Sequence, residues 1–182
     1  MRLIKWLMLL AVALTVIVAD QVTKALVIAN LAPYEEWMPI EALRPYFTIH
    51  HVRNTGAAFG ILPGGGTLLM IIALVVVGVI IYFYRQLPER VWLVRVALGL
   101  QLGGAVGNLI DRVRLGYVID FFDVKFWPVF NIADSSIVVG VFALLILMWW
   151  ADRRAKLTLP GGDQGPPDSR PSEDEPSSVA PG

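Results

Sequence analysis

Four long apolar stretches dominate this chain, at about positions 3–31, 67–84, 91–110 and 135–151. About 20 helical residues, each rising roughly 1.5 Å, cross a hydrocarbon layer about 30 Å thick. Hydrophobic residues make up 56% of the 182 residues and charged residues only 16%, which excludes an ordinary soluble domain. We therefore predict an all-α, multi-pass membrane protein with four transmembrane helices.

The distribution of Lys and Arg predicts the orientation of these spans, because positively charged flanks stay in the cytoplasm. One side carries Arg2, Lys5, Arg85, Arg90, Arg95, Arg153, Arg154 and Lys156, and the other side carries Arg44, Arg53, Arg112, Arg114 and Lys125. Both termini are thus expected in the cytoplasm. The two long connections, at about 32–66 and 111–134, are expected on the outer face.

The two ends of the chain carry separate expectations. The run LMLLAVALTVIVA near the start also fits a cleaved signal peptide, but helix-compatible sequence continues to Ala29 without Gly or Pro, which favours a retained span. Residues 157–182 are rich in Pro, Gly, Ser and acids and have no aromatic residue. We expect a membrane domain over 1–156 and a disordered cytoplasmic tail over 157–182.

Composition also restricts the chemistry. The formal net charge of zero gives no indication of nucleic-acid binding, and the absence of cysteine removes disulfides, thiolate nucleophiles and Cys-based metal sites. His50 and His51 are adjacent and point opposite ways on an extended segment, without the spacing of a metal motif. The sequence predicts no metal and no cofactor.

Two spans contain polar residues that need partners. Asp20 and Lys24 lie four residues apart in the first span, on one helix face, and an ion pair there should face the protein interior. In the third span Gly99, Gly103 and Gly107 form a stripe that lets another helix approach closely. Each feature has a purely structural explanation, a helix anchor for the pair and packing for the stripe.

The end of the third span reads GGAVGNLIDR, in which Gly104, Asn108 and Arg112 share one helix face. Asp111 lies near the predicted helix C-terminus, where the helix dipole disfavours a negative charge. A cationic partner is therefore expected for Asp111, and either Arg112 or Lys24 could serve.

The first connection contains FTIHHV, whose composition is typical of a strand, followed by Asn54 and a small-residue turn at 56–58. The segment YVID later in the chain alternates in the same way. These segments predict a small sheet on the membrane surface.

Two carboxylates, Asp120 and Asp134, lie in an apolar and aromatic stretch before and at the start of the fourth span. Taken singly, Asp120 fits an exposed loop acid and Asp134 an ordinary helix N-cap. Held together at a poorly hydrated interface, two carboxylates leave one protonated and one charged, which supplies an acid and a base for hydrolysis. Asn108, Asn131 or a backbone N–H could then stabilise developing negative charge.

Five segments in this order resemble the motif set of the lipoprotein signal peptidases, also called type II signal peptidases. They are DQVTK at 20–24, NTGAAFG at 54–60, GGAVGNLIDR at 103–112, VIDFFDV at 118–124 and FNIADSS at 130–136. The resemblance implies an aspartic endopeptidase of the bacterial cytoplasmic (inner) membrane, with four transmembrane helices, a small extracytoplasmic β-rich cradle and a surface helix.

The same resemblance implies the substrate and the site. The substrates are prolipoproteins whose lipobox cysteine carries a diacylglyceryl group, and cleavage falls just before that cysteine. Asp120 and Asp134 resemble the catalytic pair, with the site at the outer face. The residues that resemble site-supporting or substrate-binding ones are Asp20, Lys24, Asn54, Gly104, Asn108, Arg112 and Asn131. Membrane lipids are expected as further partners, and the protein is expected to be monomeric.

Two alternatives from other classes remain open at this point. A serine/lysine signal peptidase would use Ser135 or Ser136 with Lys24 as the base. A transporter or channel would use the polar residues of the spans as a pathway, although the sequence has no internal repeat of the kind found in many transporters.

Overall fold

The computed structural model describes residues 2–56, 65–88 and 91–158. In this part of the chain four helices are long and apolar enough to cross a membrane: Trp6–Asn30, Gly66–Gln86, Trp92–Leu115 and Ile132–Arg154. The four predicted spans are confirmed. The final part of the expected tail, beyond Thr158, and positions 57–60 of the NTGAAFG motif lie outside the described residues.

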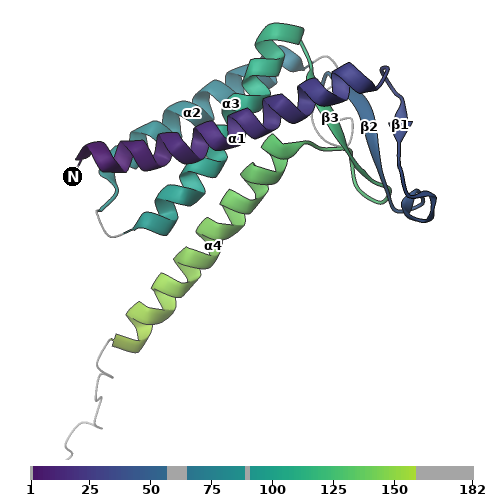
Figure 1. Cartoon of the computed structure of the whole chain (residues 1–182). Coiled ribbons are helices and arrows are strands. Elements are labelled where there is room, and N and C mark those ends of the chain that lie inside the picture. The colour runs from purple at the N-terminus through teal and green to yellow at the C-terminus, as the bar shows by residue number, and fades with distance from the viewer. Residues whose placement is uncertain (1, 57–64, 89–90, 159–182) are drawn as a thin grey trace, which may run out of the picture.

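The elements follow one another as helices interrupted by short strands (Figure 1). The chain forms α1 (Arg2–Asn30), β1 (Glu36–Trp37), the single-turn 3-10 helix η1 (Glu41–Leu43), β2 (Phe47–Asn54), α2 (Gly66–Gln86), α3 (Trp92–Leu115), β3 (Val118–Val124) and α4 (Ile132–Thr158). The strands form one antiparallel sheet in the order β1-β2-β3, at the end of the helices that lies away from the N-terminus. The predicted small sheet is confirmed.

Helix α3 is the centre of the bundle, because α1, α2 and α4 all pack against it. A Cβ added at Gly99 would lie 2.8 Å from the Val12 Cβ of α1, and one at Gly103 would lie 2.7 Å from the Val16 Cβ. The small-residue stripe therefore does let another helix approach closely, and that helix is α1. The stripe lets α1 pack directly on α3 along the two turns from Gly99 to Gly107.

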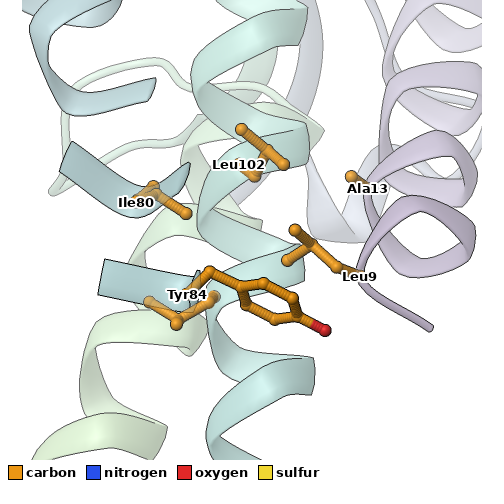
Figure 2. Close-up of a cluster of buried hydrophobic side chains, with 6 residues drawn as sticks. Leu9, Ala13, Ile80, Tyr84 and Leu102 are labelled. Atoms are coloured by element: carbon orange, nitrogen blue, oxygen red, sulfur yellow. The ribbon is translucent and has the colours of Figure 1, made fainter. Parts of the chain in front are cut away.

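Away from the sheet, an apolar cluster joins α1, α2 and α3 (Figure 2). Leu9 and Ala13 of α1 meet Tyr84 of α2 and Leu102 of α3 there. Arg95 is buried beside this cluster, its guanidinium 5.1 Å from the centre of the Tyr84 ring and donating to the backbone oxygens of the α2–α3 connection. Large apolar side chains elsewhere on α2 and α4 are exposed, as lipid-facing surfaces are.

Helix α3 runs five residues beyond the predicted end of its apolar stretch and stops at Leu115. Gly116 follows with φ of 81°, and its N–H donates to the Arg112 oxygen at 3.0 Å, which is the usual glycine stop signal. The chain then enters β3 directly. This short connection places Asp120 close to the end of α3.

Candidate active site

Asp120 and Asp134 meet at the sheet end of the bundle, where β3 and the first turn of α4 are linked by Asn131. The Asn131 Nδ2 donates to Asp120 Oδ1 at 2.7 Å, and the Asn131 backbone N–H donates to Asp134 Oδ2 at 3.3 Å. Asn131 is fully buried, Asp120 is 2% exposed and Asp134 is half-buried. One residue thus contacts both acids.

An N-cap was the ordinary explanation for Asp134 from the sequence, and this explanation is wrong. Helix α4 begins at Ile132, so Asn131 is the capping residue and Asp134 lies three positions later. The Asp134 N–H donates to Asn131 Oδ1 at 2.8 Å, and the Asn131 N–H returns the bond to the Asp134 carboxylate. This is the reciprocal pattern of a capping box, with Asn and Asp in place of the usual Ser and Glu.

A second asparagine donates a hydrogen bond to the other carboxylate oxygen of each acid. Asn54 Nδ2, at the end of β2, donates to Asp120 Oδ2 at 2.8 Å, and Asn108 Nδ2 of α3 donates to Asp134 Oδ1 at 2.7 Å. The Asn54 side chain is itself oriented by the Gly56 N–H, which donates to Asn54 Oδ1 at 3.0 Å. Neutral amide groups therefore hold both carboxylates, and each carboxylate oxygen accepts one hydrogen bond.

Burial, and after it the negative charge of the neighbouring Asp134, raise the pKa of the Asp120 carboxyl from 3.8 to about 7. The hydrogen bonds from Asn54 and Asn131 act against this rise because they favour the charged form. Asp120 accordingly holds a proton up to neutral pH.

A buried cation lies behind this pair. Lys24 Nζ is 2.8 Å from Asp20 Oδ2 and 2.8 Å from Asp111 Oδ2, and it donates to Asn108 Oδ1 at 3.0 Å. The expectation that the Asp20–Lys24 pair faces the interior is confirmed, and Lys24 is the expected cationic partner of Asp111. Because Lys24 holds the oxygen of the Asn108 amide, the nitrogen of that amide is directed at Asp134.

The same charged cluster fixes the elements that carry the acids. Asp20 Oδ1 accepts the Ala133 N–H at 3.0 Å, at the start of α4, and Asp111 Oδ2 accepts the Ile119 N–H at 3.2 Å, on β3. Gln21 Nε2 joins the two carboxylates, donating to Asp111 Oδ1 at 2.9 Å and to Asp20 Oδ2 at 3.2 Å. Sequence reasoning missed this role of Gln21, although its polar side chain inside an apolar span was a signal.

The two remaining predicted site residues lie on the same face of α3. A Cβ at Gly104 would be 2.4 Å from the Ala133 oxygen, so only glycine allows α4 this close. The Arg112 guanidinium interacts electrostatically with Asp134, Asp120 and Asp111. Arg112 and Asn108 also line a groove of about 210 Å³ between α2 and α3. All nine residues singled out from the sequence therefore lie in or beside one cluster.

The serines at the start of α4 have structural partners. Ser135 Oγ donates to the Asn131 oxygen at 2.9 Å, and Ser136 Oγ donates to the Ala133 oxygen at 2.7 Å. Lys24, the base that a serine/lysine mechanism would need, is held by its two carboxylates and Asn108. This arrangement does not favour a serine nucleophile.

Glu36, His50 and Asp123 on the sheet bring possible metal-ligand atoms within 4.8 Å of one another. The Lys125 ammonium lies 2.7 Å from Asp123 Oδ2 and 3.1 Å from Glu36 Oε2, and so forms an ion pair with each carboxylate. Its hydrogen bond to Asp123 raises the pKa of Lys125. The group is an ion-pair cluster around a lysine.

Fold and site together define a polytopic membrane protein with a pair of carboxylates, one buried and one half-buried, at one end of its helix bundle. A family profile described as signal peptidase (SPase) II matches residues 12–150. The lipoprotein signal peptidase of Halothermothrix orenii is 42% identical over 147 residues, covering 80% of this chain and 98% of that protein. The one from Caldanaerobacter subterraneus subsp. tengcongensis is 48% identical over 143 residues, covering 78% and 95%.

A solved bacterial membrane enzyme, determined by the in meso method at 2.3 Å resolution, superimposes with a TM-score of 0.75 at 33% sequence identity. The match covers 84% of this chain and 93% of that one. The chain belongs to the signal peptidase II family. It is therefore a protease of the membrane, and the transporter and channel alternative no longer applies.

Proposed function

We propose that Asp120 and Asp134 are the catalytic pair with which this peptidase removes signal peptides from prolipoproteins. As a member of the signal peptidase II family, the chain acts on prolipoprotein signal peptides. The observation that carries the assignment of the acids is the contact of both carboxylates with Asn131, which brings an acid from β3 and one from α4 to a single place.

Their environments divide the two roles. Asp120 is buried and its pKa of about 7 keeps it protonated, whereas Asp134 lies in the first turn of α4, where the helix dipole favours a negative charge. Asp134 takes a proton from a water that attacks the scissile carbonyl carbon, and Asp120 donates its proton to the carbonyl oxygen. When the tetrahedral intermediate collapses, Asp134 returns its proton to the leaving amine, the C–N bond breaks, and Asp120 takes a proton from one hydroxyl of the intermediate, which becomes the carbonyl oxygen of the product.

The supporting residues act through the pair. Asn54, Asn108 and Asn131 hold the carboxylates in position, and Asp20 with Lys24 holds Asn108 and the start of α4. Gly104 allows α4 to lie close to α3, and Arg112 supplies a positive charge toward the peptide and the intermediate. The mechanism needs no metal or cofactor.

The substrates are diacylglyceryl-modified prolipoproteins, cut just before the lipidated lipobox cysteine. A signal segment that is itself a membrane helix, joined to acyl chains at the cleavage point, brings that point to the lipid boundary. The acids lie near the ends of membrane-spanning segments, which is where such a bond would be presented. Membrane lipids surround the exposed apolar surfaces, and we propose that one chain acts as a monomer.

We place the protein in the bacterial cytoplasmic membrane, with both termini in the cytoplasm and the acids at the outer face. The support is the excess of Lys and Arg beside the ends of α2 and α4 that lie away from the sheet. A topology reporter fused after Val118 should read as extracytoplasmic. A cytoplasmic reading would overturn the orientation without affecting the assignment of the acids.

The direct test uses purified protein and a diacylglyceryl-modified lipobox peptide. Asp120→Asn and Asp134→Asn should each bind the peptide without cleaving it, whereas Asp123→Asn, the same change three positions after Asp120 on β3, should still cleave. The unlipidated peptide should be a poor substrate for the wild-type protein. Normal turnover by either Asp120→Asn or Asp134→Asn would refute the catalytic assignment.

A further inference from the structure

The groove between α2 and α3 begins beside the catalytic pair, at Asn108, which contacts Asp134, and extends into the membrane-spanning part of the bundle. Its volume is about 210 Å³, and apolar side chains such as Ile72 and Val76 of α2 and Ile137 of α4 line most of it. Its polar lining comes from one face of α3, with Arg112 and Asn108 at the catalytic end and Gln101 two turns further along. The groove therefore leads from the residues beside the acids to a polar residue within the span.

Gln101 has a donor without a partner. Its Nε2 is buried and makes no hydrogen bond among the described residues. The stem of the side chain packs closely against α4, since a Cβ added at Gly140 would lie 2.8 Å from Gln101 Cγ. A buried amide donor is costly to leave unpaired, and lipid offers it no acceptor. Its place in the groove indicates that an acceptor comes from whatever the groove binds.

A peptide that is about to be cut supplies such acceptors. Carbonyl groups of an intact signal helix are already bonded within the helix, but a segment drawn out toward the catalytic pair loses those bonds. Within the membrane region each freed carbonyl needs a new donor, because no water is available. A single amide donor in an otherwise apolar groove suits one such carbonyl.

The position of Gln101 indicates which carbonyl this is. Gln101 precedes Asn108 by seven residues, which corresponds to roughly 10.5 Å along a helix axis. An extended peptide covers that distance with about three residues at roughly 3.3 Å each. Since Gln101 lies on the membrane side of the acids, those residues belong to the signal segment before the scissile bond.

We propose that Gln101 is a substrate-binding residue whose Nε2 donates to a main-chain carbonyl of the signal segment, about three residues before the cleaved bond. This proposal rests on the proposed function of Asp120 and Asp134 as the catalytic pair of a signal peptidase. The contact is made to the bound peptide and takes no part in the proton transfers. It should therefore act on binding, while the chemical step stays unchanged.

The test compares Gln101→Met, which keeps the length of the side chain and removes the donor, with Gln86→Met at the exposed end of α2. With the lipidated lipobox peptide, Gln101→Met should raise KM about fivefold to tenfold, and kcat should stay within a factor of two. Its thermal stability without substrate should equal or exceed that of the wild type, because an unpaired donor has been removed. Gln86→Met should change neither KM nor kcat.

A second peptide identifies the acceptor. An ester in place of the amide at the third residue before the scissile bond weakens that carbonyl as an acceptor. It should raise KM for the wild type and have little additional effect on Gln101→Met. An unchanged KM for Gln101→Met, or equal ester effects in both proteins, would overturn the proposal, as would a fall in kcat accompanied by lost stability. None of these results would affect the expected loss of cleavage in Asp120→Asn. The proposal for Gln101 can therefore fail while the proposed catalytic pair remains supported.

Discussion

Replacing Gly104 by alanine should damage the enzyme more than any other single added methyl group in the membrane region. The new Cβ would meet the Ala133 oxygen at 2.4 Å, Ser136 Oγ at 2.6 Å and Ile137 Cγ1 at 2.7 Å. The first of these atoms belongs to the backbone and cannot rotate away. Restoring an ordinary contact of at least 3.4 Å requires α4 to move by about 1 Å.

The consequence for activity follows from the neighbours of Ala133. The next residue is Asp134, whose carboxylate is held by Asn108, one helical turn from Gly104 on α3. Separating α3 from α4 therefore separates the acid from the amide that positions it. A misplacement of about 1 Å in a catalytic group lowers a rate by roughly 100-fold. For stability, an overpacking cost of about 1–3 kcal/mol outweighs the helix-propensity gain of about 1 kcal/mol.

Gly78→Ala is the matched control, since a Cβ at Gly78 in α2 has no atom within 4 Å. It should leave cleavage unchanged and keep or slightly raise the unfolding temperature. Both variants can be compared in detergent by thermal unfolding and by the initial rate on a lipidated lipobox peptide. If Gly104→Ala cleaved within threefold of the wild-type rate, the close approach of α3 and α4 would not be what positions Asp134.

Three further predictions concern charge and the tail. Because Asp120 must hold its proton and has a pKa of about 7, kcat/KM should fall as pH rises through 7, and a flat profile from pH 6 to 9 would contradict this. Lys24→Met leaves the carboxylates of Asp20 and Asp111 buried without their cation. It should therefore lower the free energy of unfolding, measured by chemical denaturation, by about 3–5 kcal/mol. A variant that is stable but inactive would instead favour a catalytic lysine. Truncation after Lys156 should leave both cleavage and unfolding temperature nearly unchanged, and a large loss would show that the tail is structural.

The membrane architecture was readable from the sequence because hydropathy reports directly on lipid contact. The ends of the helices were harder to predict. Helix α3 continues past its apolar stretch because Asp111 forms an ion pair with Lys24 of α1. A polar residue that pairs within the protein looks the same in the sequence as one that ends a span. Only the tertiary structure distinguishes them.

The site was partly predictable for similar reasons. The i, i+4 spacing of Asp20 and Lys24 was enough to predict a buried pair, because both residues lie on one helix. The proximity of Asp120 and Asp134 depends on a turn between a strand and a helix, and it was inferred from a family resemblance. The ordinary alternative for Asp134, an N-cap, was wrong because Asn131 and Asp134 are both good capping residues, and local preference alone does not choose between them.

Asn131 ties an acid on a strand to an acid on a helix through its own backbone and side chain. The separation of the two carboxylates is thus set by the dimensions of one amino acid. Phe130, just before Asn131, pairs with Phe122 of β3 and keeps Asn131 beside the strand. Because the strand and the helix meet through this single residue, a small shift of either element should alter the distance between the acids and with it the rate of hydrolysis.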